Sequence, residues 1–212
     1  MSEPLAGRIT ALNKQAKNER RVNVYLDGAF AFGLSEALAA TLRVGQVLSE
    51  AEVAELRRLD LSERTYERAL RYLSYRPRSV AEVKGYLAGK GLPEDLVSET
   101  VARLSQEGLL DDRVFARLWV ENRSSFRPRG LAALRSELRR KGLDEDTIEE
   151  ATGDLDEAED AYRAAQAQAL RLQGADRKTF WRRLWGYLSR RGFPYDTVRE
   201  TVERLWRERS AR

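Results

Sequence analysis

The 212-residue sequence contains neither cysteine nor histidine. Their absence excludes disulfide bonds, thiolate metal sites, cysteine nucleophiles and Ser–His triads. A general acid or base would have to be a carboxylate, a lysine or a tyrosine. The sequence also lacks a Walker loop, a dinucleotide-binding glycine pattern and a plausible catalytic dyad. We therefore expect no enzyme activity, no cofactor and no metal site.

Long apolar runs and helix breakers are scarce as well. No run approaches the roughly 18 residues needed to cross a bilayer, and residues 1–7 lack the apolar core of a signal peptide. We therefore expect a soluble, cytoplasmic protein without membrane contact. The chain has only five prolines and 14 glycines, which is typical of long helices with short connections.

A small antiparallel sheet is predicted near the N-terminus. Residues 8–14 and 20–26 alternate apolar and polar positions with a period of two, as half-buried strands do. The pair at 27–28, Asp-Gly, suits a type I′ turn, and residues 29–33 follow as the next strand. We interpret residues 8–34 as a three-stranded sheet.

A helical pattern follows the predicted sheet over residues 35–61. Gly45 interrupts this pattern, and Ser49 with Glu52 three residues later predicts a capping box that opens another helix. A sheet this short needs a helix to pack on. We therefore predict an N-terminal sheet and helix segment over residues 1–61.

The rest of the chain contains a threefold repeat. Residues 86–95 (YLAGKGLPED) recur at 137–146 (ELRRKGLDED) and again at 187–196 (YLSRRGFPYD). The central glycine recurs after 51 and then 50 residues. Apolar positions recur in step: Val83, Leu134 and Leu184; Leu87, Leu138 and Leu188; Val97, Ile148 and Val198. Internal repetition at this spacing indicates stacked supersecondary units.

Each repeat is interpreted as three helices. A basic residue followed by glycine predicts a helix end with the glycine in the left-handed conformation, and Pro or Asp two residues later opens the next helix. The predicted helices are 63–75, 79–90 and 93–106; 111–124, 129–141 and 144–153; 156–172, 177–191 and 195–209. We thus predict a mostly α-helical tandem array of three-helix repeats at residues 62–110, 111–154 and 155–212.

One loop is duplicated between the first two repeats. Residues 75–79 (YRPRS) match residues 126–130 (FRPRG), and their prolines place both segments between two helices. Two arginines held apart by a rigid proline suit a phosphate or a carboxylate. The candidate residues are Arg76, Arg78, Arg127 and Arg129. The alternative, that the loop merely forms a turn with solvated arginines, stays open.

Charge alternates along the repeats. Residues 123–141 contain seven basic residues and one acid, residues 144–160 contain ten acids and no base, and residues 163–191 contain eight basic residues and one acid. This pattern predicts separate positive and negative surfaces. The basic residues of the middle helices suit a nucleic acid backbone or an acidic protein groove: Lys84, Lys90, Arg135, Arg139, Arg140, Lys141, Arg182, Arg183, Arg190 and Arg191. An ordinary solvated face with local Glu–Arg pairs is the alternative.

Two further groups of residues favour structural roles. The acids at 144–160 lack the spacing of a calcium loop, and helix N-caps account for many of them, with pairing to a basic partner as a second possibility. The tryptophans at positions 119, 181, 185 and 206 lie beside repeated apolar positions. We expect them in the core rather than as platforms for stacking bases.

The repeats resemble the RecX family, bacterial modulators of the RecA recombinase. The resemblance is carried by residues 70–79 (LRYLSYRPRS), 89–93 (GKGLP) and 104–116 (LSQEGLLDDRVFA), of which the Gly-Leu-Leu-Asp-Asp-x-x-Phe-Ala link is the most specific. It covers about residues 62–209, and the N-terminal sheet resembles the extra segment of longer members. In the third repeat residues 172–176 (LQGAD) replace the Arg-Pro-Arg loop, so the three repeats need not make the same contact.

The resemblance implies a negative regulator of RecA. RecX proteins are tandem three-helix repeats that bind the groove of the RecA–DNA filament, inhibit its ATPase, strand-exchange and co-protease activities, and bind single- or double-stranded DNA weakly. It also implies a place in recombination regulation, DNA repair and the SOS response. We expect this function for a monomer that uses the candidate basic residues. A stand-alone DNA-binding protein with basic helix faces and a repeat scaffold that binds neither partner stay open.

Overall fold

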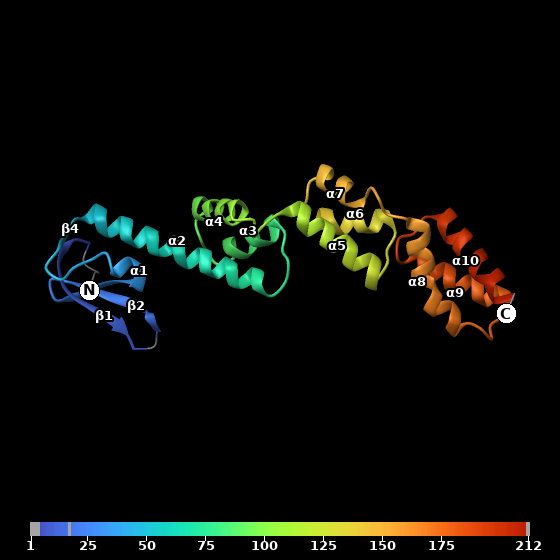
Figure 1. Cartoon of the computed structure of the whole chain (residues 1–212), viewed down its shortest axis with the longest axis horizontal. Coiled ribbons are helices and arrows are strands. Elements are labelled where there is room, and N and C mark those ends of the chain that lie inside the picture. The colour runs from blue at the N-terminus through green and yellow to red at the C-terminus, as the bar shows by residue number, and fades with distance from the viewer. Residues whose placement is uncertain (1–4, 17, 211–212) are drawn as a thin grey trace. The chain divides into compact units, whose positions relative to one another are not determined.

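The computed structural model describes residues 5–16 and 18–210 (Figure 1). The first part of the segment 1–7, for which we expect no signal peptide, lies outside the described residues. The chain divides into two compact units. Residues 1–75 and 90–102 form one unit, and residues 76–89 and 103–212 form the other.

The first unit contains a four-stranded antiparallel sheet in the order β3-β2-β1-β4. Its strands are β1 (Gly7–Gln15), β2 (Asn18–Leu26), β3 (Ala29–Ser35) and β4 (Val47–Leu48). Asp27 and Gly28, with φ values of 50° and 85°, form the turn between β2 and β3, as a type I′ turn requires. The predicted antiparallel sheet is confirmed, but the predicted number of strands, three, was wrong. The two-residue β4 is too short to show alternation in the sequence.

Two helices follow β3 in the first unit: α1 (Glu36–Ala39) and α2 (Glu50–Ser74). Val53 of α2 joins the apolar core beneath the strands. The buried Asp60 carboxylate accepts hydrogen bonds from the Arg21 guanidinium at 2.7 and 2.9 Å and from the Ser35 N–H at 2.8 Å. Because buried charges need such partners, these bonds fix α2 on the sheet.

Helix α2 is one helix of 25 residues where the sequence predicts two. Its start is as predicted, because Ser49 and Glu52 form a reciprocal capping box. The predicted break before residue 63 is wrong, because no proline or glycine stands between residues 50 and 74 and helical hydrogen bonding continues. Residue 61, a predicted domain boundary, therefore lies inside this helix.

The remaining helices follow the predicted threefold pattern. In chain order they are α3 (Val80–Ala88), α4 (Glu94–Gln106), α5 (Asp112–Phe126), α6 (Leu131–Arg140), α7 (Glu145–Thr152), α8 (Glu157–Arg171), α9 (Arg177–Ser189) and α10 (Tyr195–Ser210). Helix α4 begins in the first unit and ends in the second. The glycines after the middle helices have φ values of 72°, 82° and 83°, which confirms the predicted left-handed helix ends: Gly91, Gly142 and Gly192.

The second and third repeats each have an apolar core of their own. Phe115, Leu138 and Ile148 join α5, α6 and α7 in one core, and Phe180 and Val198 belong to the core of α8, α9 and α10. The four tryptophans are half-buried and pack against these two cores, as expected: Trp119, Trp181, Trp185 and Trp206. Within the described part of the chain, no helix is both long and apolar enough to cross a membrane.

Candidate functional site

The first Arg-Pro-Arg loop leads into a contact between successive repeats. Ser79, the N-cap of α3, donates a hydrogen bond from its hydroxyl to the carbonyl of Lys141 at 2.6 Å. The next backbone N–H, of Val80, donates to the carboxylate of Asp112, the first residue of α5, at 2.8 Å. The start of one middle helix is thereby bound to the end of the next middle helix. We call this set of contacts the first junction.

The second Arg-Pro-Arg loop leads into the same contact one repeat later. The Gly130 N–H donates to the carbonyl of Arg191 at 3.0 Å, and the Leu131 N–H donates to the carboxylate of Glu157, the first residue of α8, at 2.6 Å. We call this the second junction. It repeats the arrangement of the first junction, with a backbone N–H in place of the serine hydroxyl and a glutamate in place of the aspartate. Much of the duplicated loop sequence therefore serves to join repeats.

Small residues allow the close approach at both junctions. A Cβ added at Gly142 would overlap the Cβ of Ala81, and one at Gly192 would lie 2.6 Å from the Cβ of Ala133. A Cβ at Gly130 would overlap the carbonyl oxygen of Gly192. Gly130 has an ordinary negative φ of −63°, so lack of space, and not backbone conformation, requires glycine there.

The basic residues that follow the second and third middle helices contact the preceding repeat. Lys141 places its Nζ 2.7 Å from the carboxylate of Glu82, and Arg191 donates to the carbonyl of Pro128 at 3.1 Å. Glu82 also accepts from Arg76 at 2.8 Å. Burial opposes ionisation of Glu82, but hydrogen bonds from Arg76, Lys141 and the Ser79 N–H outweigh it and lower its pKa from 4.5 to about 2.

A buried carboxylate fixes the second arginine of the second loop. Glu137 of α6 accepts from Arg123 and from the indole of Trp119, both at 2.9 Å, and pairs with Arg129 at 3.1 Å. Its side chain is only 9% exposed. Removing one of these partners would lower the stability of the fold, because the buried Glu137 carboxylate would lose a hydrogen bond or an ion pair. Arg129 is therefore held within the repeat.

Other predicted cations on α6 contact the neighbouring helix of their own repeat. Arg135 donates to the hydroxyl of Thr152 at 3.2 Å, and Arg139 pairs with Glu145 at the start of α7 through both carboxylate oxygens. The shared face of Arg135 and Arg139 is therefore turned toward α7. Arg140 donates to the Ser136 carbonyl of its own helix.

Most of the remaining candidate cations are exposed to solvent. Arg78 is half-buried, and Arg76 is exposed despite its bond to Glu82. Arg127 ends α5 as its C-cap and is exposed. Arg76 and Arg139 are exposed, and each pairs with a carboxylate of the protein. We call the other exposed candidates the exposed set: Lys84, Lys90, Arg127, Arg140, Arg182, Arg183 and Arg190. The sequence pattern does not separate these residues from Arg129, Arg135, Lys141 and Arg191, whose charged ends contact other helices or loops of the protein.

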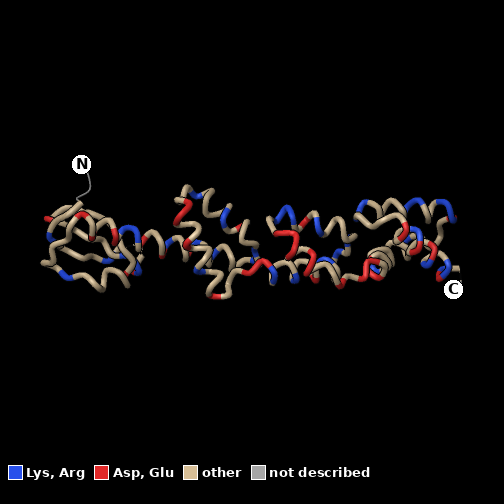
Figure 2. Tube along the Cα trace, turned by 90° about the horizontal axis from the view of Figure 1, so that it is seen from above, with Lys and Arg blue, Asp and Glu red and all other residues tan. Residues whose placement is uncertain are grey.

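The acids at 144–160 perform the structural tasks favoured by the sequence. Asp144 and Asp156 cap α7 and α8 by accepting from backbone N–H groups three residues later. Others pair with nearby arginines, as Glu150 does with Arg113 at 3.5 Å. Figure 2 shows acidic segments following basic ones along the Cα trace. Among the described residues, no three Asp or Glu side chains are grouped so that they would hold a metal ion.

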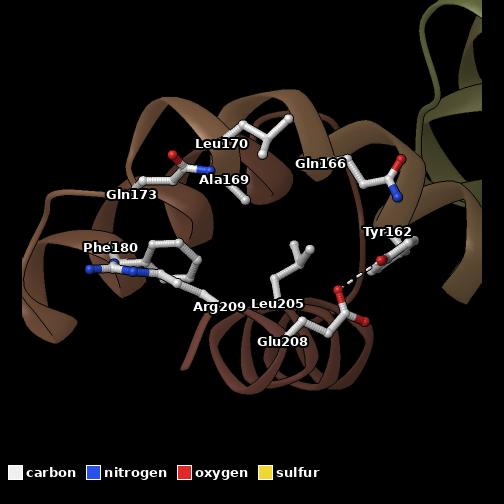
Figure 3. Close-up of a pocket in the computed structure, with 9 residues that line it drawn as sticks. All are labelled: Tyr162, Gln166, Ala169, Leu170, Gln173, Phe180, Leu205, Glu208 and Arg209. Atoms are coloured by element: carbon white, nitrogen blue, oxygen red, sulfur yellow. Dashed lines mark hydrogen bonds between the residues drawn. The ribbon is translucent and has the colours of Figure 1, made fainter. Parts of the chain in front are cut away.

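A pocket of about 550 Å³ lies in the third repeat (Figure 3). Phe180 and Leu205 form part of its apolar wall. At one end the Tyr162 hydroxyl donates to Glu208 at 2.8 Å, and at the other Arg209 donates to two backbone carbonyls at 2.8 and 3.2 Å. Both charged groups of the lining, Glu208 and Arg209, thus form hydrogen bonds with groups of the third repeat.

Known families match the chain along most of its length. A family model described as the regulatory protein RecX N-terminal domain matches residues 7–49. Models of the first, second and third RecX three-helix domains match residues 66–104, 111–151 and 156–202. The chain belongs to the RecX family. The family consists of regulatory proteins, and the predicted fold class is confirmed.

Individual RecX proteins show the same relationship. The regulatory protein RecX of Bacillus licheniformis is 32% identical over 200 residues, covering 92% of this chain and 76% of its own. That of Bacillus subtilis is 31% identical over 203 residues, covering 93% and 76%. A crystal structure of a regulatory protein RecX superposes with a TM-score of 0.70 at 28% identity, covering 93% of this chain and 98% of that one. RecX from Lactobacillus salivarius gives 0.59 at 26% identity, covering 68% and 96%.

Proposed function

We propose that this protein is a negative regulator of RecA that binds the groove of the RecA–DNA filament and inhibits its ATPase, strand-exchange and co-protease activities. Membership in the RecX family supports the regulatory part of this proposal. The repeated junction is the observation that supports a filament as partner. It joins α3 to α6 and α6 to α9 through equivalent contacts, so that equivalent positions of the middle helices recur along the chain of repeats, as binding sites do along a filament.

We place the contact on the exposed candidate cations and not on the whole predicted set. Arg129, Arg135, Lys141 and Arg191 bind groups of the protein itself, so their substitution would act through the structure of the repeats. The exposed cations, of which Arg127, Arg182 and Arg183 are examples, are accessible to phosphates and acidic protein patches. We propose that a monomer makes several such weak contacts at once, in the cytoplasm and with weak affinity for DNA alone.

The test is ATP hydrolysis by RecA preassembled on single-stranded DNA, with the protein titrated in at constant salt. We expect inhibition well below one copy per RecA monomer. The triple variant Arg127→Glu, Arg182→Glu and Arg183→Glu should lose this inhibition. A matched control, Arg20→Glu, Arg43→Glu and Arg64→Glu, changes net charge equally at exposed positions of the first unit and should retain it. Absence of inhibition by the unmodified protein at excess would refute the proposal.

The second candidate function is a stand-alone DNA-binding protein. The exposed arginines of α9 favour it, because exposed cations bind phosphates without a protein partner. Such a protein would bind DNA with an affinity that falls steeply with salt, and it would affect RecA only by competing for DNA. Raising the DNA concentration would then restore ATP hydrolysis, whereas a filament regulator would remain inhibitory.

A further inference from the structure

Each Arg-Pro-Arg loop is preceded by an aromatic side chain that the fold leaves in solvent. Phe126, the last residue of α5, is 77% exposed, and Tyr75, its equivalent in the first repeat, is 82% exposed. A large apolar side chain contributes to stability mainly through burial. At this exposure the Phe126 ring contributes little to the fold. An exposed aromatic side chain therefore precedes both loops, and an aromatic ring in solvent is available to stack on a flat ligand.

The residue after Phe126 adds a positive charge without an internal partner. Arg127 forms no ion pair within residues 5–16 and 18–210, although Arg129, two residues later, pairs with Glu137. The Arg127 backbone is fixed, because its N–H donates to the Arg123 carbonyl at 2.8 Å. Phe126 and Arg127 therefore present a flat ring and an uncompensated guanidinium side by side in the sequence.

The second junction holds the chain that follows this pair. Pro128 is buried and its carbonyl accepts from Arg191, while the Gly130 N–H donates to the Arg191 carbonyl. Arg129 is bound to Glu137. A binding group on a backbone that is already ordered loses little entropy when its ligand arrives. The pair is therefore a preorganised surface rather than part of a loose turn.

We propose that Phe126 and Arg127 bind one nucleotide of a single-stranded nucleic acid, with the base stacked on the Phe126 ring and a phosphate bound by Arg127. Unpaired bases offer flat faces to aromatic side chains, and each is followed by a phosphate that pairs with arginine. A duplex buries its base faces in its own stack, so it can use Arg127 but not the ring. An acidic protein would likewise use the cation and has no corresponding need for the ring. Arg127 is one of the exposed cations of the proposed function, so this proposal rests on the weak DNA affinity stated there. Its test is made without RecA, so that failure of this proposal and failure of RecA inhibition can be distinguished.

The test compares single strands with duplexes on the full-length protein. Fluorescence anisotropy with a labelled 30-nucleotide oligo(dT) strand, and with a blunt duplex of the same length, gives both dissociation constants. Phe126→Leu, which keeps an apolar side chain and removes the ring, should raise the constant for the single strand by about fivefold or more. The duplex constant should not change. Phe126→Tyr retains the ring and should behave as the unmodified protein does.

Two further measurements test the role of the Arg127 charge and the stability of the Phe126→Leu variant. Arg127→Gln should weaken both ligands and reduce the slope of log affinity against log salt by about one. Thermal unfolding should be unchanged in Phe126→Leu, since the ring is exposed. Equal effects of Phe126→Leu on strand and duplex, or no effect on either, would overturn the proposal. If Phe126→Leu lost RecA inhibition while its dissociation constant for the single strand stayed unchanged, the proposal would also be overturned. The Phe126 ring would then be assigned to a contact with protein.

Discussion

The second and third repeats begin their middle helices in different ways. In the second repeat, the N-cap Gly130 has no side chain to cap α6, and its N–H is bonded to Arg191 of the following repeat. In the third repeat, the N-cap Asp176 accepts from the Thr179 N–H at 2.9 Å, so α9 is capped from within. Measured from the repeat glycines, α9 begins 15 residues earlier and α6 only 11 residues earlier.

The difference indicates what the Arg-Pro-Arg loop does. The loop is present where the start of a middle helix contacts the next repeat, as at α3 and α6. Ahead of α9 it is replaced by residues 172–176, and α9 has additional helical residues at its start. The proline of the loop ends the preceding helix, and the start of the middle helix is then accessible to the neighbouring repeat. The loop is thus first a joint between repeats, and any ligand contact is made by the groups that the joint does not use.

The largest effect expected from this comparison is at Gly130. Gly130→Ala places a Cβ against the Gly192 carbonyl oxygen and should lower the free energy of unfolding by about 3 kcal/mol, as overpacking against backbone does. The control is Gly174→Ala in the corresponding segment of the third repeat, where a Cβ has no neighbour within 4 Å. Urea denaturation measures both. Equal stability of the two variants would refute the contact at the second junction.

Acid should remove the stabilising contribution of Glu82 at the first junction. The folded-state pKa of Glu82 is lowered from 4.5 to about 2, so its ionised form stabilises the fold above pH 4.5, and this contribution is lost as the pH falls toward 2. We expect a loss of about 2 kcal/mol over that window, after allowing for screening by solvent. Unfolding at pH 2 to 6 measures it, with Glu82→Gln as reference. A variant with the same pH slope as the unmodified protein would disprove the assignment.

A smaller effect should separate the two kinds of arginine in the third repeat. Arg191→Gln removes the hydrogen bond to the Pro128 carbonyl and should lower the free energy of unfolding by about 1 kcal/mol. Arg182→Gln alters an exposed side chain of α9, the helix that ends just before Arg191, and should change the free energy of unfolding by less than about 0.5 kcal/mol. The urea concentrations at which the two variants are half unfolded test this prediction. Should Arg182→Gln prove the more destabilising, our division of the cations into structural and exposed sets would be wrong.

Helices and turns were predictable because their signals are local. Ser49 and Glu52 mark a helix start, and glycines such as Gly142 mark helix ends, within a few residues of the structure they produce. The sheet was predicted from the same kind of signal, while β4, with two residues, has none. The break in α2 was wrongly predicted because polar residues were interpreted as a helix boundary, although neither proline nor glycine is present there.

The junctions were not predictable from the sequence alone. Ser79 and Lys141 are 62 residues apart, and no local pattern connects a hydroxyl with a carbonyl at that distance in the chain. The roles of the cations were hidden for a similar reason. Arg127 and Arg129 are the same residue type two positions apart, yet only Arg129 meets a carboxylate, because Glu137 on the following helix lies beside it. Periodicity identified the repeats but not what each charge contacts.

The composition of the junctions also has a consequence for the history of the chain. Each acceptor at a helix end is a main-chain carbonyl, which every amino acid supplies. Ser79 in one repeat and Gly130 in the next satisfy it equally, and Lys141 and Arg191 are equally able to provide it. A copied segment of about 50 residues would therefore find this acceptor in its parent at once. It could then diverge as long as the positions crowded by the neighbour stay small and a carboxylate stays at the start of the next first helix.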